Sequence, residues 1–465
     1  MSADRSNSFD VIVCGGGPSG VAAALSAARN GARTLLIERY GFCGGMATAA
    51  LVNPWAGHEY RNPTDGRRGS LIGGIFEEVA SGLKQRGGFG SSLSPSAFDE
   101  EMLKSVYDEL LIAAKVSVRY HSFVSGVTKA GDRIQAVKIL SKGGIEEFPA
   151  AAFIDCSGDA DLVAQSGCAF SIGRLSDGLM QAMTVSFRMA NVDKRAMIET
   201  GNLRKARALV EPYFQAAIRS GELHYPYRNF VHFYDYPRPG VLHFNMTRIN
   251  RVSGLSAADL SIAEMEGRRQ AFLISDWLIR SVPFFRHAYL EKAACQVGVR
   301  ETRHIHGTYQ MTMSDIVSGR KFSDGITRSC YFIDIHNPVG AQDEHQRPDG
   351  RGAVKADYGP PPGDYYEVPF RSMITPDCPN LIVACRALSA THEASAAVRV
   401  MATMHGLGEA AGIAAAESVR TGVDLAGIPG DWVRSQIRYM HSGPDYSDLW
   451  NVPGDVFDHL PAGLL

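Results

Sequence analysis

Apolar and polar positions form a regular succession over the first forty residues. Residues 9–14 are an apolar run rich in β-branched side chains, which predicts a buried strand. An alanine-rich stretch at 21–30 predicts a helix closed by Gly31, and residues 32–37 predict a second buried strand. A strand, a glycine-rich turn, a helix and another strand are typical of the first βαβ unit of a parallel sheet.

The pattern after this unit predicts both helices and antiparallel strands. Residues 70–85 and 96–115 are expected to be helical, because apolar side chains recur on one face of the second stretch. Alternating residues at 116–130, 133–140 and 145–153 predict a small antiparallel meander.

The remainder of the chain is mixed. Its expected elements are strands at 185–189, 230–236 and 241–245, a long helix at 256–281, buried strands near 151–155 and at 380–384, and a helix at 396–419. The last three indicate a return to the first sheet. A polar, Pro/Gly-rich segment at 342–364 is expected to be either a mobile lid or a surface excursion.

Charge and composition narrow the class of protein. The 465 residues carry 47 Lys and Arg against 49 Asp and Glu, so the net charge of −2 lacks the footprint of a nucleic-acid-binding protein. No apolar run reaches the roughly 18 residues of a membrane span. The polar N-terminus lacks a signal core, so a cytoplasmic protein is expected. None of the eight cysteines forms a CxxC pair, so no metal site is expected.

The turn after the first strand has the pattern of a nucleotide site. Gly15 permits the tight turn, Gly17 lets a pyrophosphate approach the backbone, and Gly20 lets the helix pack against the sheet. The helix N-terminus offers free N–H groups to phosphates. Glu38, at the end of the second strand, can accept hydrogen bonds from an adenosine ribose. This complete context predicts a dinucleotide-binding domain.

A second glycine-rich loop, with Gly44 and Gly45, follows Glu38. An NAD-dependent dehydrogenase would continue here with ordinary βα units. A second glycine pair indicates backbone that passes close to the pyrophosphate or the ring system of a longer cofactor. The sequence therefore favours FAD.

Several segments between residues 10 and 412 together resemble a known family. They include DVIVCGGGPSGVAAALSAARNGARTLLIER, GGMATAALVNP, AFIDCSGDADLVAQSG, GVRETRHIHGTY, YFIDIHNPVG and NLIVACRALSATHEASAAVRVMATMHGLGEAAG. The chain resembles the FAD-dependent oxidoreductases of the glutathione-reductase/succinate-dehydrogenase-like flavoprotein superfamily.

This resemblance implies an α/β fold. It consists of a Rossmann-like FAD-binding domain of the glutathione-reductase-2 type (ββα with an antiparallel meander) and an inserted, mixed α+β substrate domain. The expected divisions are the first FAD-binding part at 1–170, with a helical insertion at about 55–115, the substrate or cap domain at 171–370, the FAD-binding return segment at 371–430, and a C-terminal tail at 431–465.

The resemblance also implies a set of cofactor-binding residues. They are Gly15, Gly17, Pro18, Ser19, Gly20, Glu38, Arg39, Gly44, Gly45, Met46, Thr48, Val124, Ser157, Gly158, Asp159 and Arg386. Similar proteins usually carry glycine where this chain has Cys385. The bulkier cysteine either alters the position or redox potential of the flavin or is merely tolerated.

The candidate catalytic residues lie in the matched segments. His336 and His392 suit general acid–base work at neutral pH, and Arg303 is a third candidate. Arg300 and Arg399, together with His336, are expected to bind substrate, because guanidinium groups hold carboxylates. Two alternatives stay open: structural histidines, and an ion-pair network of the arginines with Glu301.

The chain has no second strand–GxGxxG–helix unit and no CxxxxC pair, which argues against an NAD(P)H domain and a disulfide reductase. We therefore expect a dehydrogenase or oxidase that transfers hydride from a small organic substrate to flavin N5. The alternatives are a flavin-dependent monooxygenase using NAD(P)H and dioxygen, an electron-transfer subunit of a complex, or a protein in which FAD is structural. The electron acceptor is open between dioxygen, a quinone and a protein. A homo-oligomer is also open.

Overall fold

A five-stranded parallel sheet carries the glycine-rich turn. The computed structural model describes residues 8–223, 230–340 and 358–450. The strand order is β18-β9-β1-β2-β5, with parallel pairing throughout. The strands are β1 (Val11–Cys14), β2 (Thr34–Ile37), β5 (Ser117–Arg119), β9 (Ala152–Asp155) and β18 (Leu381–Val383). All residues of β1, β2, β9 and β18 are buried, which explains their continuous apolar character.

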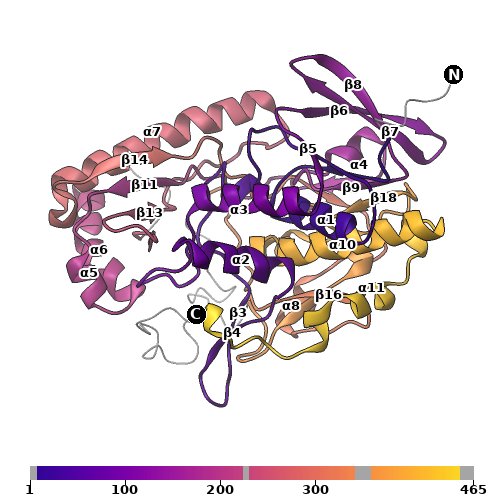
Figure 1. The fold of residues 1–465 in the computed structure, drawn as a ribbon. Helices are drawn as coiled ribbons and strands as arrows, with labels where there is room; N and C mark the ends of the chain where they lie inside the picture. The colour runs from indigo at the N-terminus through magenta and orange to yellow at the C-terminus, as the bar shows by residue number, and fades with distance from the viewer. Residues whose placement is uncertain (1–7, 224–229, 341–357, 451–465) are drawn as a thin grey trace.

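Two helices from opposite ends of the chain lie side by side on one face of this sheet (Figure 1). They are α1 (Pro18–Arg29) and α10 (Met401–Thr421). Small residues permit their close approach: a Cβ on Gly408 would lie 2.0 Å from the carbonyl oxygen of Ser19. Beyond them lie α2 (Ile75–Gln85) and α3 (Glu100–Ala113).

The other face of the sheet packs against the antiparallel meander, which extends at the upper right of Figure 1. The meander consists of β6 (Phe123–Ala130), β7 (Arg133–Ser141) and β8 (Gly144–Pro149). The smaller elements of this half are β3 (Glu59–Arg61), β4 (Arg68–Ser70), α4 (Asp161–Gln165), β10 (Phe170–Ile172), β15 (Arg303–Ile305), α8 (Met313–Val317), β16 (Gly325–Ser329), β17 (Tyr366–Pro369), α9 (His392–Val398) and α11 (Gly430–Gln436).

A four-stranded antiparallel sheet, in the order β12-β13-β11-β14, forms the part drawn at the left of Figure 1, which we call the cap. Its elements are β11 (Phe187–Ala190), α5 (Arg195–Glu199), α6 (Leu203–Ser220), β12 (Phe233–Asp235), β13 (Leu242–Phe244), α7 (Ala257–Ser281) and β14 (Tyr289–Ala293). Phe187, Phe233 and Phe244 pack with α6 and α7 in one apolar core. The neighbouring Arg188 and Tyr234 belong to the opposite, polar face, because side chains alternate along a strand.

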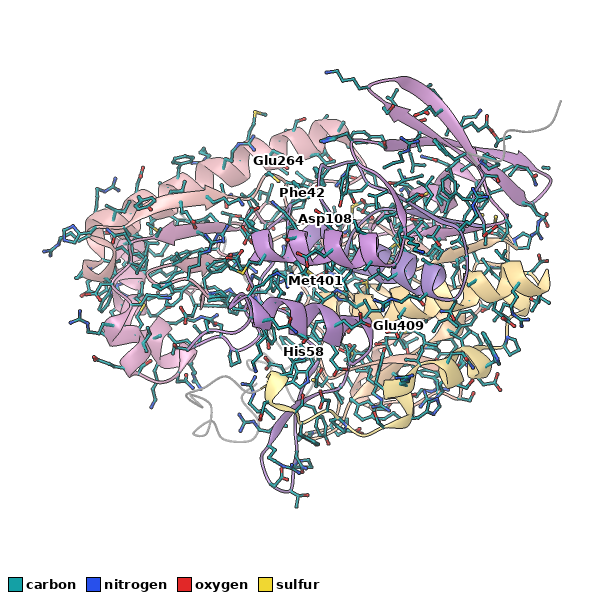
Figure 2. All side chains as sticks on the ribbon, viewed as in Figure 1. Phe42, His58, Asp108, Glu264, Met401 and Glu409 are labelled. Carbon is teal, nitrogen blue, oxygen red and sulfur yellow. The ribbon has the colours of Figure 1, made fainter. Side chains whose placement is uncertain are left out.

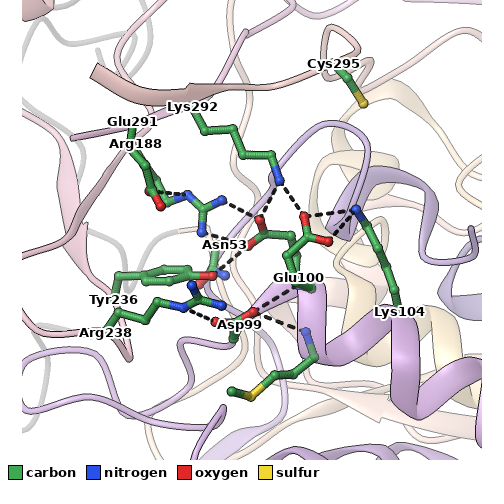
Figure 3. Close-up of polar contacts among 12 residues, drawn as sticks. Asn53, Asp99, Glu100, Lys104, Arg188, Tyr236, Arg238, Glu291, Lys292 and Cys295 are labelled. Carbon is green, nitrogen blue, oxygen red and sulfur yellow. Dashed lines mark hydrogen bonds and ion pairs between the residues drawn. The ribbon is translucent and has the colours of Figure 1, made fainter. Parts of the chain in front are cut away.

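Buried ion pairs join the cap to the start of α3 (Figure 3). The Glu100 carboxylate accepts hydrogen bonds from both Nη atoms of Arg188, from the Tyr236 hydroxyl at 2.7 Å and from Lys292 at 3.1 Å. Burial raises the pKa of Glu100, but Arg188 and these hydrogen bonds outweigh it and lower the pKa to about 2. The carboxylate is therefore ionised at neutral pH and fixes the cap against the nucleotide-binding half.

Several expected elements are present and others are shifted. The helix α7 begins after Ser256 as expected, and the Ser256 side chain accepts the Asp259 N–H. The helix expected at 70–85 starts only at Ile75, because Gly74 has a positive φ. The helix expected at 96–115 starts at Glu100, because Asp99 is its N-cap.

Two expectations about longer elements are wrong. The stretch 116–130 divides into β5 and β6, with His121 in the left-handed region between them, and β5 joins the parallel sheet instead of the meander. The helix expected at 396–419 is two helices, α9 and α10, because Val400 is extended. Most of the polar segment at 342–364 lies outside the described residues. The structure does not test the expected domain boundaries, which stay predictions.

Candidate active site

One continuous cavity of about 780 Å³ joins the glycine-rich turn to the cap. Its volume lies within the range of about 300–1,000 Å³ that is typical of ligand pockets. The ends of β1 and β2 and the start of α1 line one end. The other end is lined by Tyr331, Phe332, Asp334 and His336, and by Tyr234 of the cap sheet. Met401, labelled in Figure 2, lines the cavity from the start of α10.

The nucleotide end of the cavity fits FAD. Gly17 is the N-cap of α1, and no side chain caps that helix. A Cβ on Gly17 would meet no protein atom within 4 Å, so open space lies at the positive end of the helix. The Glu38 carboxylate lines this end and accepts the N–H groups of Gly16 at 2.6 Å and Tyr40 at 2.9 Å. A dinucleotide needs space for its pyrophosphate at a helix N-terminus and an acidic side chain that can accept hydrogen bonds from its ribose. This end of the cavity offers both.

Most of the sequence-predicted cofactor residues line the cavity. Those that do are Gly15, Gly17, Pro18, Ser19, Glu38, Arg39, Gly45, Met46, Val124, Ser157, Gly158 and Arg386. Tyr40, Asp161 and Leu162 also line it, although the sequence did not indicate them. Cys385 lines it as well, and burial raises the pKa of its thiol to about 12, so the group is neutral at physiological pH.

Four predicted cofactor residues are absent from the cavity lining, as far as the structure describes it. They are Gly20, Gly44, Thr48 and Asp159. The Gly44 N–H donates to a carbonyl of the glycine-rich turn at 2.7 Å, and the Thr48 hydroxyl donates to a loop carbonyl at 2.9 Å. Asp159 forms an ion pair with Arg386. Gly44, Thr48 and Asp159 therefore hold the loops that form the lining.

Asp334 organises the polar groups at the far end of the cavity. Its Oδ2 accepts a hydrogen bond from the Tyr331 hydroxyl at 2.9 Å and lies 3.4 Å from Nε2 of His336. The guanidinium of Arg399 donates to the Asp334 backbone carbonyl at 3.0 Å. Burial opposes ionisation of Asp334, but His336 and Arg399 outweigh it and hold the pKa of this carboxyl well below its usual range. All four residues line the cavity, so its wall contains a histidine that is paired with a carboxylate.

Sequence reasoning singled out His336 and Arg399 but missed Asp334 and Tyr331. A signal for Asp334 was present, because it stands two residues before His336 in the matched segment. The irregular backbone after β16 brings Asp334 and His336 to the same cavity wall. Arg300 also lines this end, and its Nη1 donates to the Ala182 carbonyl.

Arg303 and His392, the two other candidate catalytic residues, are not among the described residues of the lining. Nη1 of Arg303 donates to the backbone carbonyl of Asp159 at 2.7 Å and to the Asp161 carboxylate at 3.0 Å, so it braces the loop after β9. Nδ1 of His392 lies 2.7 Å from Oε1 of Glu301. Glu301 is thus paired with histidine instead of the arginines that adjoin it in sequence.

Two negative findings concern the described part of the chain. No group of three or more His, Cys, Asp or Glu side chains there could hold a metal ion. No helix within the same residues has the length and apolar character needed to cross a membrane.

The parallel sheet, the glycine-rich turn at a helix N-terminus and the acid after β2 define a dinucleotide-binding fold. A family model described as FAD dependent oxidoreductase matches residues 10–437, so the chain belongs to this family. The protein is an FAD-dependent oxidoreductase.

Three solved structures illustrate the wider similarity. A geranylgeranyl bacteriochlorophyll reductase-like protein from Thermoplasma acidophilum is 14% identical, with 99% of this chain and 94% of that chain covered and a TM-score of 0.45. A myxobacterial chondrochloren halogenase is 13% identical, with 93% and 79% covered and a TM-score of 0.43. The p-nitrophenol 4-monooxygenase from Pseudomonas putida is 15% identical, with 65% and 70% covered and a TM-score of 0.37. A comparison with curated proteins finds no match.

Proposed function

We propose that this protein is a dehydrogenase or oxidase that oxidises a small hydroxylated substrate bearing an anionic group. The observation that carries the proposal is the His336–Asp334 pair, which faces the same cavity as the cofactor-binding turn. When bound, FAD supplies an acceptor for the hydride that leaves the substrate carbon. The protein must then remove the hydroxyl proton and hold the substrate in place.

His336 is the group we assign to the proton. A neutral imidazole can accept the proton of a substrate hydroxyl, and the nearby Asp334 carboxylate stabilises the imidazolium that results. Asp334 itself stays ionised, because its pKa lies well below the usual range. Tyr331 fixes the carboxylate through its 2.9 Å hydrogen bond.

Arg300 and Arg399 are the groups we assign to the anionic part of the substrate. Both line the far end of the cavity. Each guanidinium is oriented by a backbone carbonyl, that of Ala182 for Arg300 and that of Asp334 for Arg399. A carboxylate bound there would be held by charge-assisted hydrogen bonds, and the adjoining hydroxyl would lie toward His336.

The test is the rate of anaerobic flavin reduction by a panel of hydroxy acids and polyols. The His336→Asn variant should bind FAD normally but reduce it at least about a hundredfold more slowly, which is the scale of general-base catalysis. Arg399→Met should chiefly raise KM for carboxylated substrates and change little for neutral ones. Undiminished reduction in the His336 variant would contradict the assignment. Reduction only by NADPH would support a monooxygenase instead.

A further inference from the structure

Glu301 has a fully buried carboxylate one residue after the substrate-binding candidate Arg300. Its Oε1 accepts hydrogen bonds from Nε2 of His304 at 2.9 Å and Nδ1 of His392 at 2.7 Å. Its Oε2 accepts the backbone N–H of Gln181 at 2.9 Å. Burial opposes ionisation, but the hydrogen bonds from the two histidines outweigh it and lower the pKa of Glu301 to about 2. The Glu301 carboxylate is therefore ionised at neutral pH and accepts three hydrogen bonds.

The Gln181–Ala182 segment connects Glu301 to the cavity wall. The Gln181 side-chain Oε1 accepts the backbone N–H of His336 at 3.3 Å. The Ala182 N–H donates to the His336 carbonyl at 3.2 Å, so the segment holds the His336 backbone on both sides. The Ala182 carbonyl accepts Nη1 of Arg300. One short segment therefore fixes both the proposed base and a proposed substrate-binding group.

The tautomer of His304 agrees with a donor role. Nδ1 of His304 is buried and has no hydrogen-bond partner among the residues that the structure describes. A hydrogen on Nδ1 would leave an unsatisfied buried donor, so we place the ring hydrogen on Nε2, where it meets Glu301. This histidine supplies a hydrogen bond and is not among the described residues that line the 780 Å³ cavity.

We propose that Glu301 is a positioning residue. By anchoring the Gln181–Ala182 segment, it sets the place of His336 and Arg300 in the cavity, while His304 and His392 serve it as hydrogen-bond donors. The inference rests on the proposed function for its catalytic meaning. It assigns to His392 a role different from proton transfer, although sequence alone made this residue a candidate base.

Two substitutions of His392 separate positioning from proton transfer. In His392→Asn the amide nitrogen takes the approximate place of Nδ1 and can still donate to Glu301, but it cannot titrate. In His392→Ala the donor is lost. We expect His392→Ala to lower kcat by about ten- to a hundredfold, the scale of a small misplacement of catalytic groups. His392→Asn should restore most of the rate. Equal loss in both variants would overturn the proposal.

Hydrogen exchange gives a second readout that needs no substrate. Glu301→Gln should speed exchange at the amides of Gln181, Ala182 and His336 in the FAD-loaded protein. The matched control is Glu367→Gln. Glu367 is similarly buried but lies on β17, where its carboxylate accepts hydrogen bonds from Arg434 at 2.9 Å and from the Phe322 N–H at 3.0 Å.

The control should leave exchange at the Gln181–Ala182 segment and at His336 unchanged. Unaltered exchange at these three amides in Glu301→Gln would overturn the positioning role, whether or not the variant is active. If no organic compound reduces the flavin, the proposed function fails, but the exchange result still decides whether Glu301 anchors the segment.

Discussion

Glu409 is a carboxyl group of α10 that packs against the start of α2 (Figure 2). Its Oε2 accepts the Ile75 N–H at 3.3 Å, and a Cβ on Gly74 would lie 2.4 Å from the same oxygen, so little room for water is left there. Burial is the main reason why the pKa of Glu409 rises from 4.5 to about 7, with a smaller contribution from Glu78. We predict that this group makes stability depend on pH.

The sign follows from proton linkage. Since the folded pKa is raised, the contribution of Glu409 is fully present below about pH 4.5 and is lost as the pH rises to about 7. A shift of about 2.5 units corresponds to about 3 kcal/mol at 1.36 kcal/mol per unit. Because Glu409 is only partly buried, we expect the free energy of unfolding to fall by about 2 kcal/mol over this pH range.

The Glu409→Gln variant removes the charge and keeps an acceptor for the Ile75 N–H. In urea denaturation, the free energy of unfolding of Glu409→Gln should be similar to that of the native protein at pH 5. At pH 8 it should be about 2 kcal/mol higher. The control is Glu417→Gln on the same helix. The pKa of Glu417 is lowered by its hydrogen bonds from Arg420, so it titrates below this pH window. An equal change in the free energy of unfolding at pH 5 and pH 8 in Glu409→Gln would show that ionisation of Glu409 does not make stability depend on pH.

Three further predictions concern the frame of the site. Gly408→Ala places a Cβ 2.0 Å from the backbone of α1, so thermal unfolding should show destabilisation of about 3 kcal/mol and weaker FAD retention; unchanged retention would show that α1 does not depend on this packing. Glu38→Gln should weaken FAD binding about tenfold or more in a fluorescence titration, because a charge-assisted hydrogen bond to ribose is lost; equal affinity would contradict its role. Arg188→Met should lower the free energy of unfolding in urea by about 3 kcal/mol, because the buried Glu100 carboxylate would lose its ion pair with Arg188. An unchanged free energy of unfolding would argue that this ion pair does not hold the cap.

The nucleotide-binding end was the part of the site that sequence could predict. Its information is local: Gly15, Gly17 and Glu38 fall within a single βαβ unit whose geometry is nearly fixed by the order of its elements. The same locality made α7 predictable from its apolar pattern and its serine cap. Element boundaries depended on single residues, such as Asp99 as N-cap of α3 and Gly74 before α2.

The far end of the cavity could be predicted only in part, because its contacts cross long stretches of chain. Arg399 stands 63 residues after His336, and tertiary packing brings its guanidinium to the Asp334 carbonyl. Glu301 and His392 likewise meet through tertiary packing. No periodicity encodes such a meeting, so sequence reasoning made His392 a candidate base, whereas the structure places it beside a buried carboxylate.

We expect an organic compound, and not a nicotinamide nucleotide, to reduce the flavin of this protein. The most direct measurement is an anaerobic absorbance titration of the FAD-loaded protein, followed at the flavin band of about 450 nm. Hydroxy acids and polyols would be added first, and NADH and NADPH afterwards. A hydroxylated, anionic compound should bleach the band, and the nicotinamide nucleotides should not. Rapid bleaching by NADPH alone would contradict this expectation.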